Sequence, residues 1–256
     1  MDRNLLRGKF ETGRAIVGTW VSIPHPIVVE AMASAGFDFF QVDGEHAPCD
    51  PDSLHQILPA SEAAGVPVVY RARRNRDDLI SAALDAGVHA VMLPMVNSPE
   101  AAKAAVSATK YPPEGRRGFG PWRASNYYRE ATAYRQEANA STFLAVQIEH
   151  VDAVRAADAI AAIKGVDLLY VGPADLALSM GLAVGQRHED MDRAFKNVGE
   201  ACRRHGKIAG TDIGDLELVA PLAGMGYSYF TYGADLSYLA LGADEAAATF
   251  RRAIKP

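Results

Sequence analysis

The stretch that decides the fold is residues 143–175, FLAVQIEHVDAVRAADAIAAIKGVDLLYVGPAD. A short apolar run at 143–147 precedes an alanine-rich segment of helical spacing at 151–165, and a second apolar run follows at 168–171. Two apolar runs joined by one helical segment predict a strand, a helix and a second strand parallel to the first. The same alternation continues in both directions along the chain.

Apolar runs of strand character recur along the whole sequence. We predict strands at residues 15–21, 37–42, 67–71, 90–93, 143–147, 168–171, 207–211 and 227–231. Segments of helical spacing lie at residues 51–65, 76–87, 98–110, 151–165 and 191–206. This alternation in 256 residues is typical of a (β/α)8 barrel rather than of an open sheet. We therefore expect one domain over residues 1–256, with an irregular excursion at about 110–140 that is helical in its second half.

Composition and charge narrow the choice of partners. The formal net charge is −5 and the basic residues are scattered, which predicts no basic face for nucleic acid or an anionic membrane. The sequence has no signal-peptide core and no apolar run of about 18 residues. The two cysteines, Cys49 and Cys202, suit a reducing compartment and offer no disulfide framework. We expect a cytoplasmic protein that binds neither nucleic acid nor membrane.

The ends of the predicted strands give a shortlist of functional residues, because barrel enzymes place their chemistry where strands end and loops begin. The polar and aromatic residues at these positions are Trp20, Asp43, Glu45, His46, Arg71, Asn97, Gln147, Glu149, Asp175, Thr211, Asp212 and Tyr232. Carboxylates, an imidazole, a guanidinium and an amide are therefore predicted to meet on one rim.

Glu149 and Asp175 follow the neighbouring strands predicted at 143–147 and 168–171. Such strands lie roughly 4.8 Å apart, so the two carboxylates can meet above the barrel. Like charges that close need a cation or a shared proton, and a hard divalent ion such as Mg²⁺ or Mn²⁺ suits two carboxylates better than zinc does. The alternative is that Glu149 caps one helix and Asp175 begins another.

His46 and Arg71 are the candidates for proton transfer and for oxyanion stabilisation. A histidine can move protons near neutral pH, and an arginine offers a fixed fork of donors to a carboxylate or a developing oxyanion. Asp43, three residues before His46, is placed to orient the imidazole or a water bound to it. The alternatives are a loop histidine bonded to its own turn and a surface arginine beside Arg73 and Arg74.

Six segments resemble a known family. They are QVDGEHAP (41–48), VVYRARRN (68–75), ALDAGVHAVMLPMV (83–96), KYPPEGRRGFG (110–120), LAVQIEHVDAV (144–154) and GVDLLYVGPADLALSMG (165–181). They resemble the HpcH/HpaI class of metal-dependent 2-oxo-acid aldolases, which includes 4-hydroxy-2-oxoheptanedioate aldolase and 5-keto-4-deoxyglucarate aldolase. The resemblance extends over nearly the whole chain, and DGEHAP followed by GPADL is more specific than either motif alone.

The resemblance implies a (β/α)8 barrel of the phosphoenolpyruvate/pyruvate type and a role for each rim residue. Glu149 and Asp175 would bind the divalent metal, Mg²⁺, Mn²⁺ or Co²⁺, with no organic cofactor. His46, supported by Asp43, would be the acid/base, and Arg71 would steady the keto or enolate oxygen. The implied reaction cleaves or forms a 4-hydroxy-2-oxo acid through a metal-stabilised enolate of pyruvate or hydroxypyruvate, with an aldehyde as the second partner.

Other residues are expected to bind substrate or to act between subunits. The expected substrate-binding residues are Trp20, Arg71, Gln147, Gly172, Pro173, Ala174, Asp175 and Thr211, with main-chain NH groups near Ala174 and Asp175 receiving the substrate carboxylate. By resemblance, Asp85 is catalytic and reaches a neighbouring subunit's site, although taken by itself it would be a solvated acid. Family members form hexamers, often trimers of dimers that exchange the last helix, and residues 244–255 have a suitable amphipathic pattern.

Two segments depart from the commoner family pattern, GTDIGD at 210–215 and TYGADLSYL at 231–239. Together with residues 118–128 they are expected to meet the aldehyde. Thr211, Asp212, Trp122, Arg123 and Tyr127 would then favour a polar, hydroxylated partner, unless they serve packing alone. No glycine-rich phosphate loop follows the last two predicted strands, so a phosphorylated substrate is not expected.

Rival functions remain open at this point. A Schiff-base aldolase needs a lysine at the rim, and the lysines fall elsewhere; Lys207, for example, is at the opposite end of its strand. A CoA-ester lyase or a 2-oxo-acid decarboxylase of the same superfamily would use similar chemistry, and a CoA-ester lyase would need a basic entrance, for which Arg116, Arg117 and Arg123 are the candidates. A non-catalytic barrel that binds a 2-oxo acid would need no proton shuttle such as His46.

Overall fold

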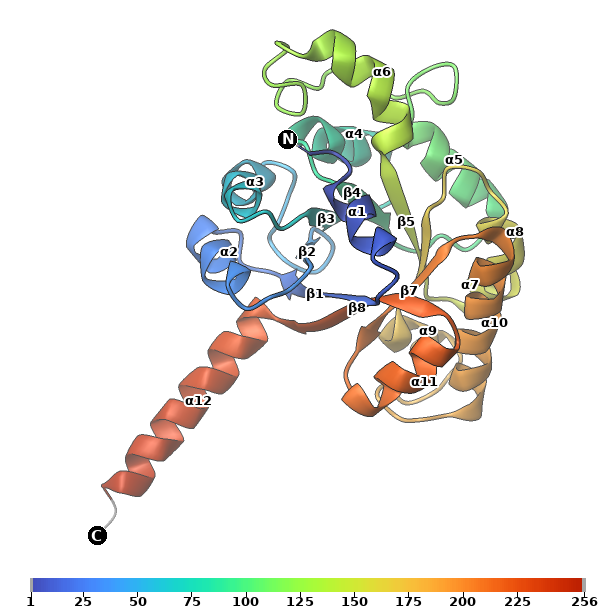
Figure 1. Ribbon diagram of the computed structural model, residues 1–256. Coiled ribbons are helices and arrows are strands. Elements are labelled where there is room, and N and C mark those ends of the chain that lie inside the picture. The colour runs from blue at the N-terminus through green and yellow to red at the C-terminus, as the bar shows by residue number, and fades with distance from the viewer. Residues whose placement is uncertain (1, 255–256) are drawn as a thin grey trace.

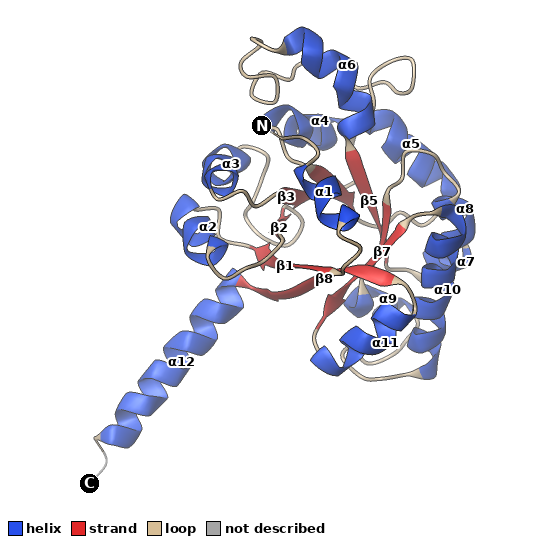
Figure 2. Ribbon diagram, viewed as in Figure 1, coloured by secondary structure: helices blue, strands red, loops and turns tan. Residues whose placement is uncertain are grey.

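The computed structural model describes residues 2–254, and its centre is a closed barrel of eight parallel strands in the order β1 to β8 (Figures 1 and 2). The strands are β1 (Ile16–Val21), β2 (Phe39–Asp43), β3 (Val68–Arg71), β4 (Ala90–Leu93), β5 (Phe143–Ile148), β6 (Leu168–Val171), β7 (Ile208–Ile213) and β8 (Tyr227–Ala234). Pairing of β8 with β1, in which Ile16 lies opposite Tyr229, closes the barrel. All the predicted strands are confirmed; the largest difference in bounds is at β8, which extends three residues beyond the predicted end at 231.

Helices surround the barrel, as predicted for a (β/α)8 fold. They are α1 (Leu5–Glu11), α2 (Pro26–Ala33), α3 (Leu54–Ala63), α4 (Asp77–Ala86), α5 (Pro99–Thr109), α6 (Ala131–Ser141), α7 (Val151–Arg155), α8 (Ala157–Ala161), α9 (Pro173–Ser179), α10 (Glu189–His205), the 3-10 helix η1 (Leu216–Leu218), α11 (Val219–Gly224) and α12 (Asp235–Ala253). The single helix predicted over 151–165 is wrong in detail, because the chain breaks at Ala156 into α7 and α8.

The barrel interior is packed and is closed at its amino-terminal end. Inward-facing side chains such as Phe39, Phe143 and Tyr229 form one apolar cluster, which also includes Leu6 of α1. Phe10 of the same helix lies alongside the rings of Phe143 and Tyr229. Helix α1, which the sequence analysis did not predict, therefore covers the amino end of the barrel (Figure 1).

A second, larger apolar layer lies between the barrel and the helices. Alternating strand residues point outward into it, as Val42 and Val146 do, and meet helix residues such as Leu58 and Ile80. The excursion after α5 forms a small cluster of its own from Tyr111, Ala124, Tyr134 and Ala138, and its second half is the predicted helix, α6.

Helix α12 extends away from the barrel (Figure 2). Of its residues, Asp235 is buried, and its carboxylate accepts hydrogen bonds from the backbone N–H groups of Ser22 and Ile23. The apolar side chains farther along the helix, including Leu239, Leu241 and Phe250, are exposed. Within residues 2–254, no helix combines the length and apolar character needed to cross a membrane.

Candidate active site

A cavity of about 400 Å³ opens at the carboxyl ends of the barrel strands. It is lined by Trp20, Ser22, Asp43, His46, Arg71, Gln147, Glu149, Tyr170, Gly172, Pro173, Ala174, Asp175, Asp212 and Ala234. Most of the residues predicted at the rim therefore lie together. The volume is sufficient for a small organic acid, and polar groups from several strands converge on it.

Arg71 is held rigidly in this cavity. Its Nε donates to Asp43 Oδ1 at 3.0 Å, its Nη2 lies 2.9 Å from Asp43 Oδ2, and its Nη1 lies 3.4 Å from Glu45 Oε2. The guanidinium carbon is 4.3 Å from the centroid of the Trp20 ring, a cation–π contact. Arg71 is buried, so the alternative of a surface arginine does not apply. Burial opposes the ionisation of Asp43, but the Arg71 guanidinium keeps the pKa of this carboxyl below its usual value.

The polar cluster after β2 is a tight turn organised by Asp43. Its Oδ1 accepts the backbone N–H groups of Glu45 at 2.9 Å and of His46 at 3.1 Å. A side chain at Gly44 would lie 2.3 Å from the Tyr70 hydroxyl, so only glycine fits at the centre of the turn. Asp43 therefore contacts His46 through the backbone rather than through the ring, which does not support direct orientation of the imidazole by Asp43. The alternative, that Asp43 orients a water bound to the imidazole, stays a prediction.

The His46 imidazole lies at the mouth of the cavity with 64% of its side chain exposed. Its Nε2 is 3.8 Å from Glu45 Oε2. Glu45, to which the sequence analysis gave no role, is thus placed between the imidazole and Arg71, and burial raises the pKa of its carboxyl. Its position two residues after a strand end was the available sequence signal.

Glu149 is buried and fixed by two donors. Its Oε1 accepts the backbone N–H of Met95 at 2.6 Å, and its Oε2 accepts Gln147 Nε2 at 2.9 Å. Met95 has a φ of 53°, in the left-handed region that few side chains adopt. Burial raises the pKa of Glu149 to about 7, and the nearby carboxylates of Glu45 and Asp175 add to the shift.

Neither metal candidate is a helix cap. The N-cap of α7 is His150, whose Nδ1 accepts the backbone N–H of Asp152. The N-cap of α9 is Gly172, and Asp175 lies in the first turn of that helix. The capping alternative for Glu149 is therefore wrong, and Asp175 begins α9 without being its N-cap. Both carboxylates line the cavity.

The residues around Glu149 and Asp175 are chemically suited to bind a hard divalent cation. Burial raises the pKa of Glu149, and the nearby carboxylates of Glu45 and Asp175 add to the shift. Arg71, the one permanent cation among residues 2–254 that lines the cavity, is already paired with Asp43. The Oε1 atom of Gln147 is buried without a hydrogen-bond partner. A Cβ at Gly172 would lie 2.8 Å from Glu149 Oε2, so glycine leaves room for the carboxylate.

The donor set also limits which ion would suit. Across residues 2–254, no three histidine, cysteine or acidic side chains are grouped as metal ligands. Two carboxylates alone suit an ion that keeps other positions for water or substrate oxygens, as Mg²⁺ and Mn²⁺ do.

Thr211 and Asp212 face opposite sides of β7. Thr211 is fully buried, and its hydroxyl donates to the carbonyl oxygen of Val171 at 3.0 Å, outside the cavity. The substrate-binding role predicted for Thr211 is therefore not supported. Asp212 lines the cavity instead, because successive residues of a strand point to opposite faces.

Asp85 and the 118–128 loop lie away from the cavity of their own chain. Asp85 accepts a hydrogen bond from Arg117 Nη2 at 2.6 Å, so it is not a simple solvated acid. Arg123 binds Glu62, and the Trp122 ring lies 4.9 Å from the His55 ring on the outer face of the barrel. The contact of Trp122, Arg123 and Tyr127 with an aldehyde, predicted from the sequence, is not found in the single chain. The role of Asp85 in a neighbouring subunit's site stays a prediction.

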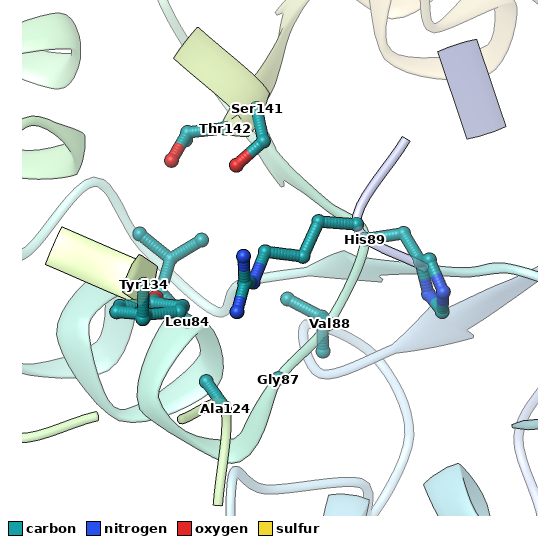
Figure 3. Close-up of a pocket in the computed structure, with 9 residues that line it drawn as sticks. Leu84, Gly87, Val88, His89, Ala124, Tyr134, Ser141 and Thr142 are labelled. Carbon is teal, nitrogen blue, oxygen red and sulfur yellow. The ribbon is translucent and has the colours of Figure 1, made fainter. Parts of the chain in front are cut away.

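A second, much smaller cavity of about 30 Å³ lies at the amino end of the barrel (Figure 3). His89 is beside it, and burial lowers the pKa of this histidine to about 4. Its Nδ1 accepts the backbone N–H of Val68 at 3.1 Å. The space suits a water or two rather than a substrate, so this end of the barrel is structural.

Comparison with known proteins agrees with the resemblance seen in the sequence. The model of the HpcH/HpaI aldolase/citrate lyase family matches residues 17–240. Hydroxypyruvate/pyruvate aldolase of Cupriavidus necator is 37% identical over 239 residues, which are 93% of this chain and 89% of that protein. 5-keto-4-deoxy-D-glucarate aldolase of Escherichia coli (strain K12 / DH10B) is 33% identical over 249 residues, 95% of this chain and 93% of that protein.

A solved structure gives the same result for the fold. The crystal structure of a family protein from Burkholderia cenocepacia J2315 has a TM-score of 0.89 and 34% sequence identity, and the match covers 97% of this chain and 99% of that one. The chain therefore belongs to the HpcH/HpaI aldolase/citrate lyase family, whose members include aldolases and lyases.

Proposed function

We propose that this protein is a divalent-metal-dependent aldolase that cleaves or forms 4-hydroxy-2-oxo acids. Its donor would be pyruvate or hydroxypyruvate, and its second substrate an aldehyde. The observation that carries the proposal is the presence of two uncompensated carboxylates, Glu149 and Asp175, in one cavity with the rigid guanidinium of Arg71. The names of the relatives in Cupriavidus necator and Escherichia coli support the choice of substrate class.

Glu149 and Asp175 would hold the metal ion. Its contribution, when bound, would be to polarise the keto group of the substrate and to offset the negative charge of the enolate. The Met95 N–H and the Gln147 amide fix the orientation of the Glu149 carboxylate. These contacts would keep the metal site in place before substrate arrives.

Arg71 would stabilise the keto oxygen as it becomes an enolate oxygen. Its bidentate contact with Asp43 and its position over the Trp20 ring leave the guanidinium little freedom. A donor held in this way does not need to reorganise as charge develops, which is where such groups contribute most.

His46 would move the proton of the 4-hydroxyl group. In the cleavage direction this proton leaves the hydroxyl, the C3–C4 bond breaks, and its electron pair remains in the enolate while C4 becomes the aldehyde. The exposed imidazole would contact the part of the substrate nearest to solvent, and Glu45, whose Oε2 lies 3.8 Å from His46 Nε2, would orient the ring.

The start of α9 would bind the substrate carboxylate. Gly172, Pro173, Ala174 and Asp175 all line the cavity. Backbone N–H groups in the first turn of a helix lack partners within the helix and favour an anion. Gln147 lies beside this segment, within reach of Gly172.

The alternative function, a CoA-ester lyase, would need a basic entrance to the site, and the three candidate arginines do not provide one. Of the arginines that would form a basic entrance, Arg116 pairs with Asp77, Arg117 with Asp85 and Arg123 with Glu62. None of these three is left free for a nucleotide phosphate.

We also propose a homo-oligomer, a hexamer arranged as a trimer of dimers with α12 exchanged between subunits. The exposed Leu239, Leu241 and Phe250 on a helix directed away from its own barrel support this arrangement. Light scattering on the full chain should give six times the mass of the 27.4 kDa subunit. A monomeric mass would contradict the proposal.

The catalytic proposal can be tested with metal-stripped protein. Mg²⁺, Mn²⁺ or Co²⁺ would be added back with pyruvate or hydroxypyruvate and a panel of short aldehydes, and the 4-hydroxy-2-oxo acid product measured. Glu149→Ala should abolish the metal-dependent reaction, and His46→Ala should reduce it by about a hundredfold or more. Glu217→Ala, which removes an exposed acid outside the cavity, is the matched control. Absence of both product and metal-dependent deuterium exchange into pyruvate would overturn the proposal.

A further inference from the structure

Asp212 lines the cavity but has no part in the reaction proposed above. It belongs to β7, four strands from β3 in the closed barrel of eight, so it lies across the mouth from Arg71. Asp212 is half-buried, and among the described residues no arginine, lysine or histidine forms an ion pair with it. The Asp212 carboxylate is therefore stabilised by hydrogen-bond donors other than a charged side chain.

One oxygen of the Asp212 carboxylate is held by the protein. Asp212 Oδ1 accepts Trp20 Nε1 at 2.9 Å and the Thr231 hydroxyl at 2.5 Å. Because the Thr231 proton is used in this bond, the neighbouring Tyr170 hydroxyl must donate to Thr231. The other oxygen, Oδ2, accepts no hydrogen bond from any residue in the range 2–254. The carboxylate is thus fixed in orientation with one acceptor free.

Trp20 lies between Asp212 and Arg71, the residue proposed to bind the keto oxygen. The face of its ring contacts the Arg71 guanidinium, and its N–H contacts Asp212. A 2-oxo acid bound between Arg71 and the Glu149–Asp175 pair would therefore lie near the Trp20 ring, whose face is covered by the Arg71 guanidinium and whose N–H edge contacts Asp212. Asp212 also lies within β7, one residue before the end of the strand, as Gln147 does in β5, rather than on a loop above the barrel. A donor substrate bound beside Gln147 would be at a similar depth.

We propose that Asp212 is a specificity-determining residue that accepts a hydrogen bond from a substrate hydroxyl, and that this hydroxyl is the C3 hydroxyl of the donor. The enzyme would then prefer a 3-hydroxy-2-oxo acid, hydroxypyruvate, to pyruvate. This inference rests on the proposed aldolase function. A methyl group at the same place would leave the carboxylate partly desolvated without a partner, and sites built to bind a hydroxyl discriminate strongly against analogues that lack it.

The proposal can be tested with two substitutions and one control. Asp212→Asn keeps an acceptor for Trp20 and Thr231 but replaces the free oxygen with an amide NH₂ group. Asp212→Leu removes both acceptors. Glu217→Gln removes one negative charge from the exposed segment after β7 and leaves the cavity intact. Circular dichroism and thermal melting would establish that each variant is folded, and Asp212→Asn carries the test if Asp212→Leu is not.

The first measurement is kcat/KM for hydroxypyruvate and for pyruvate with one aldehyde and saturating Mg²⁺. We expect the ratio of the two values to fall by about tenfold or more in Asp212→Leu, to fall less in Asp212→Asn, and to be unchanged in Glu217→Gln. Calorimetric titration with the same two acids, in the presence of Mg²⁺, should show the same change in the ratio of Kd values.

A second arm separates the two possible sources of the hydroxyl. With pyruvate as a fixed donor, acetaldehyde and glycolaldehyde would be compared as acceptors. An unchanged donor ratio in both Asp212 variants would overturn the proposal, as would a change confined to the acceptor pair. Failure of the aldolase function itself would be visible in the wild-type protein, which would then give no product with either donor, and the calorimetric ratio would still decide the role of Asp212.

Discussion

The two ends of the barrel both contain buried or half-buried polar groups, but they use them differently. At the amino end, Asp167 accepts the Leu144 N–H and pairs with Arg7, Asp38 accepts the Val17 N–H, and His89 accepts the Val68 N–H. Each of these groups accepts a hydrogen bond from a backbone N–H near the start of a strand, so its hydrogen-bond partners lie within the protein. Such groups contribute to stability and offer little to a ligand.

At the carboxyl end, charge is left unbalanced. Glu45 and Glu149 have raised pKa values because they are buried near other carboxylates, and Asp212 has a free oxygen. Within residues 2–254, Arg71 is the one permanent cation that lines this cavity. The comparison teaches that an unsatisfied arrangement of charges, rather than burial itself, distinguishes the reactive end from the structural end.

Among the tests of this comparison, the largest effect is expected from Arg71→Lys. Lysine keeps the charge but cannot form the bidentate contact with Asp43 or the flat contact with Trp20. We expect kcat/KM to fall by about a hundred- to a thousandfold, the range seen when one oxyanion donor is lost, with little change in melting temperature. A variant with near wild-type activity would show that the charge alone suffices and would weaken the distinction between the two ends.

The pH dependence of stability gives a second test. The native pKa of Glu149, about 7, lies above its ordinary value of 4.5. Between these values the native state holds a proton that the unfolded chain has released, so the metal-free protein should lose stability as pH rises through this window, by about 3 kcal/mol at most. The contribution is fully present below about pH 4.5 and lost above about pH 7.

Denaturant unfolding of the wild type and of Glu149→Gln would be compared at several pH values. The difference between them gives the contribution of the Glu149 carboxyl alone to the free energy of unfolding. Mg²⁺ should reduce the loss at high pH, because a bound cation replaces the proton. If the two proteins have the same slope of stability against pH, the carboxyl end does not carry the unbalanced charge described above.

The smallest effect, and the one that tests the amino end, is expected from His89→Leu. The substitution replaces the imidazole with an apolar side chain of similar size and leaves the Val68 N–H without its acceptor. We expect a loss of about 1 to 2 kcal/mol in the free energy of unfolding and unchanged kcat/KM. A loss of activity without a loss of stability would show that the amino end also takes part in function.

The sequence predicted the fold and most of the rim because both depend on local patterns. Strand and helix periodicity can be read in windows of a few residues, and polar residues at strand ends point to one edge of a barrel. It did not predict the Met95 N–H on Glu149, since a backbone group 54 residues away with a φ of 53° leaves no signal in a methionine. The sequence placed both Thr211 and Asp212 at the rim, but it did not show which of the two faces the cavity, because the predicted strand ended at 211 and successive residues of a strand point to opposite faces.

The contacts of Trp20 have a consequence for spectroscopy. The chain has two tryptophans, and Trp122 lies on the outer surface against His55 and Tyr127. In a Trp122→Phe variant all indole emission would therefore come from the ring between Arg71 and Asp212. The colour and intensity of that emission would report directly on whether the cavity is occupied, without any reaction taking place.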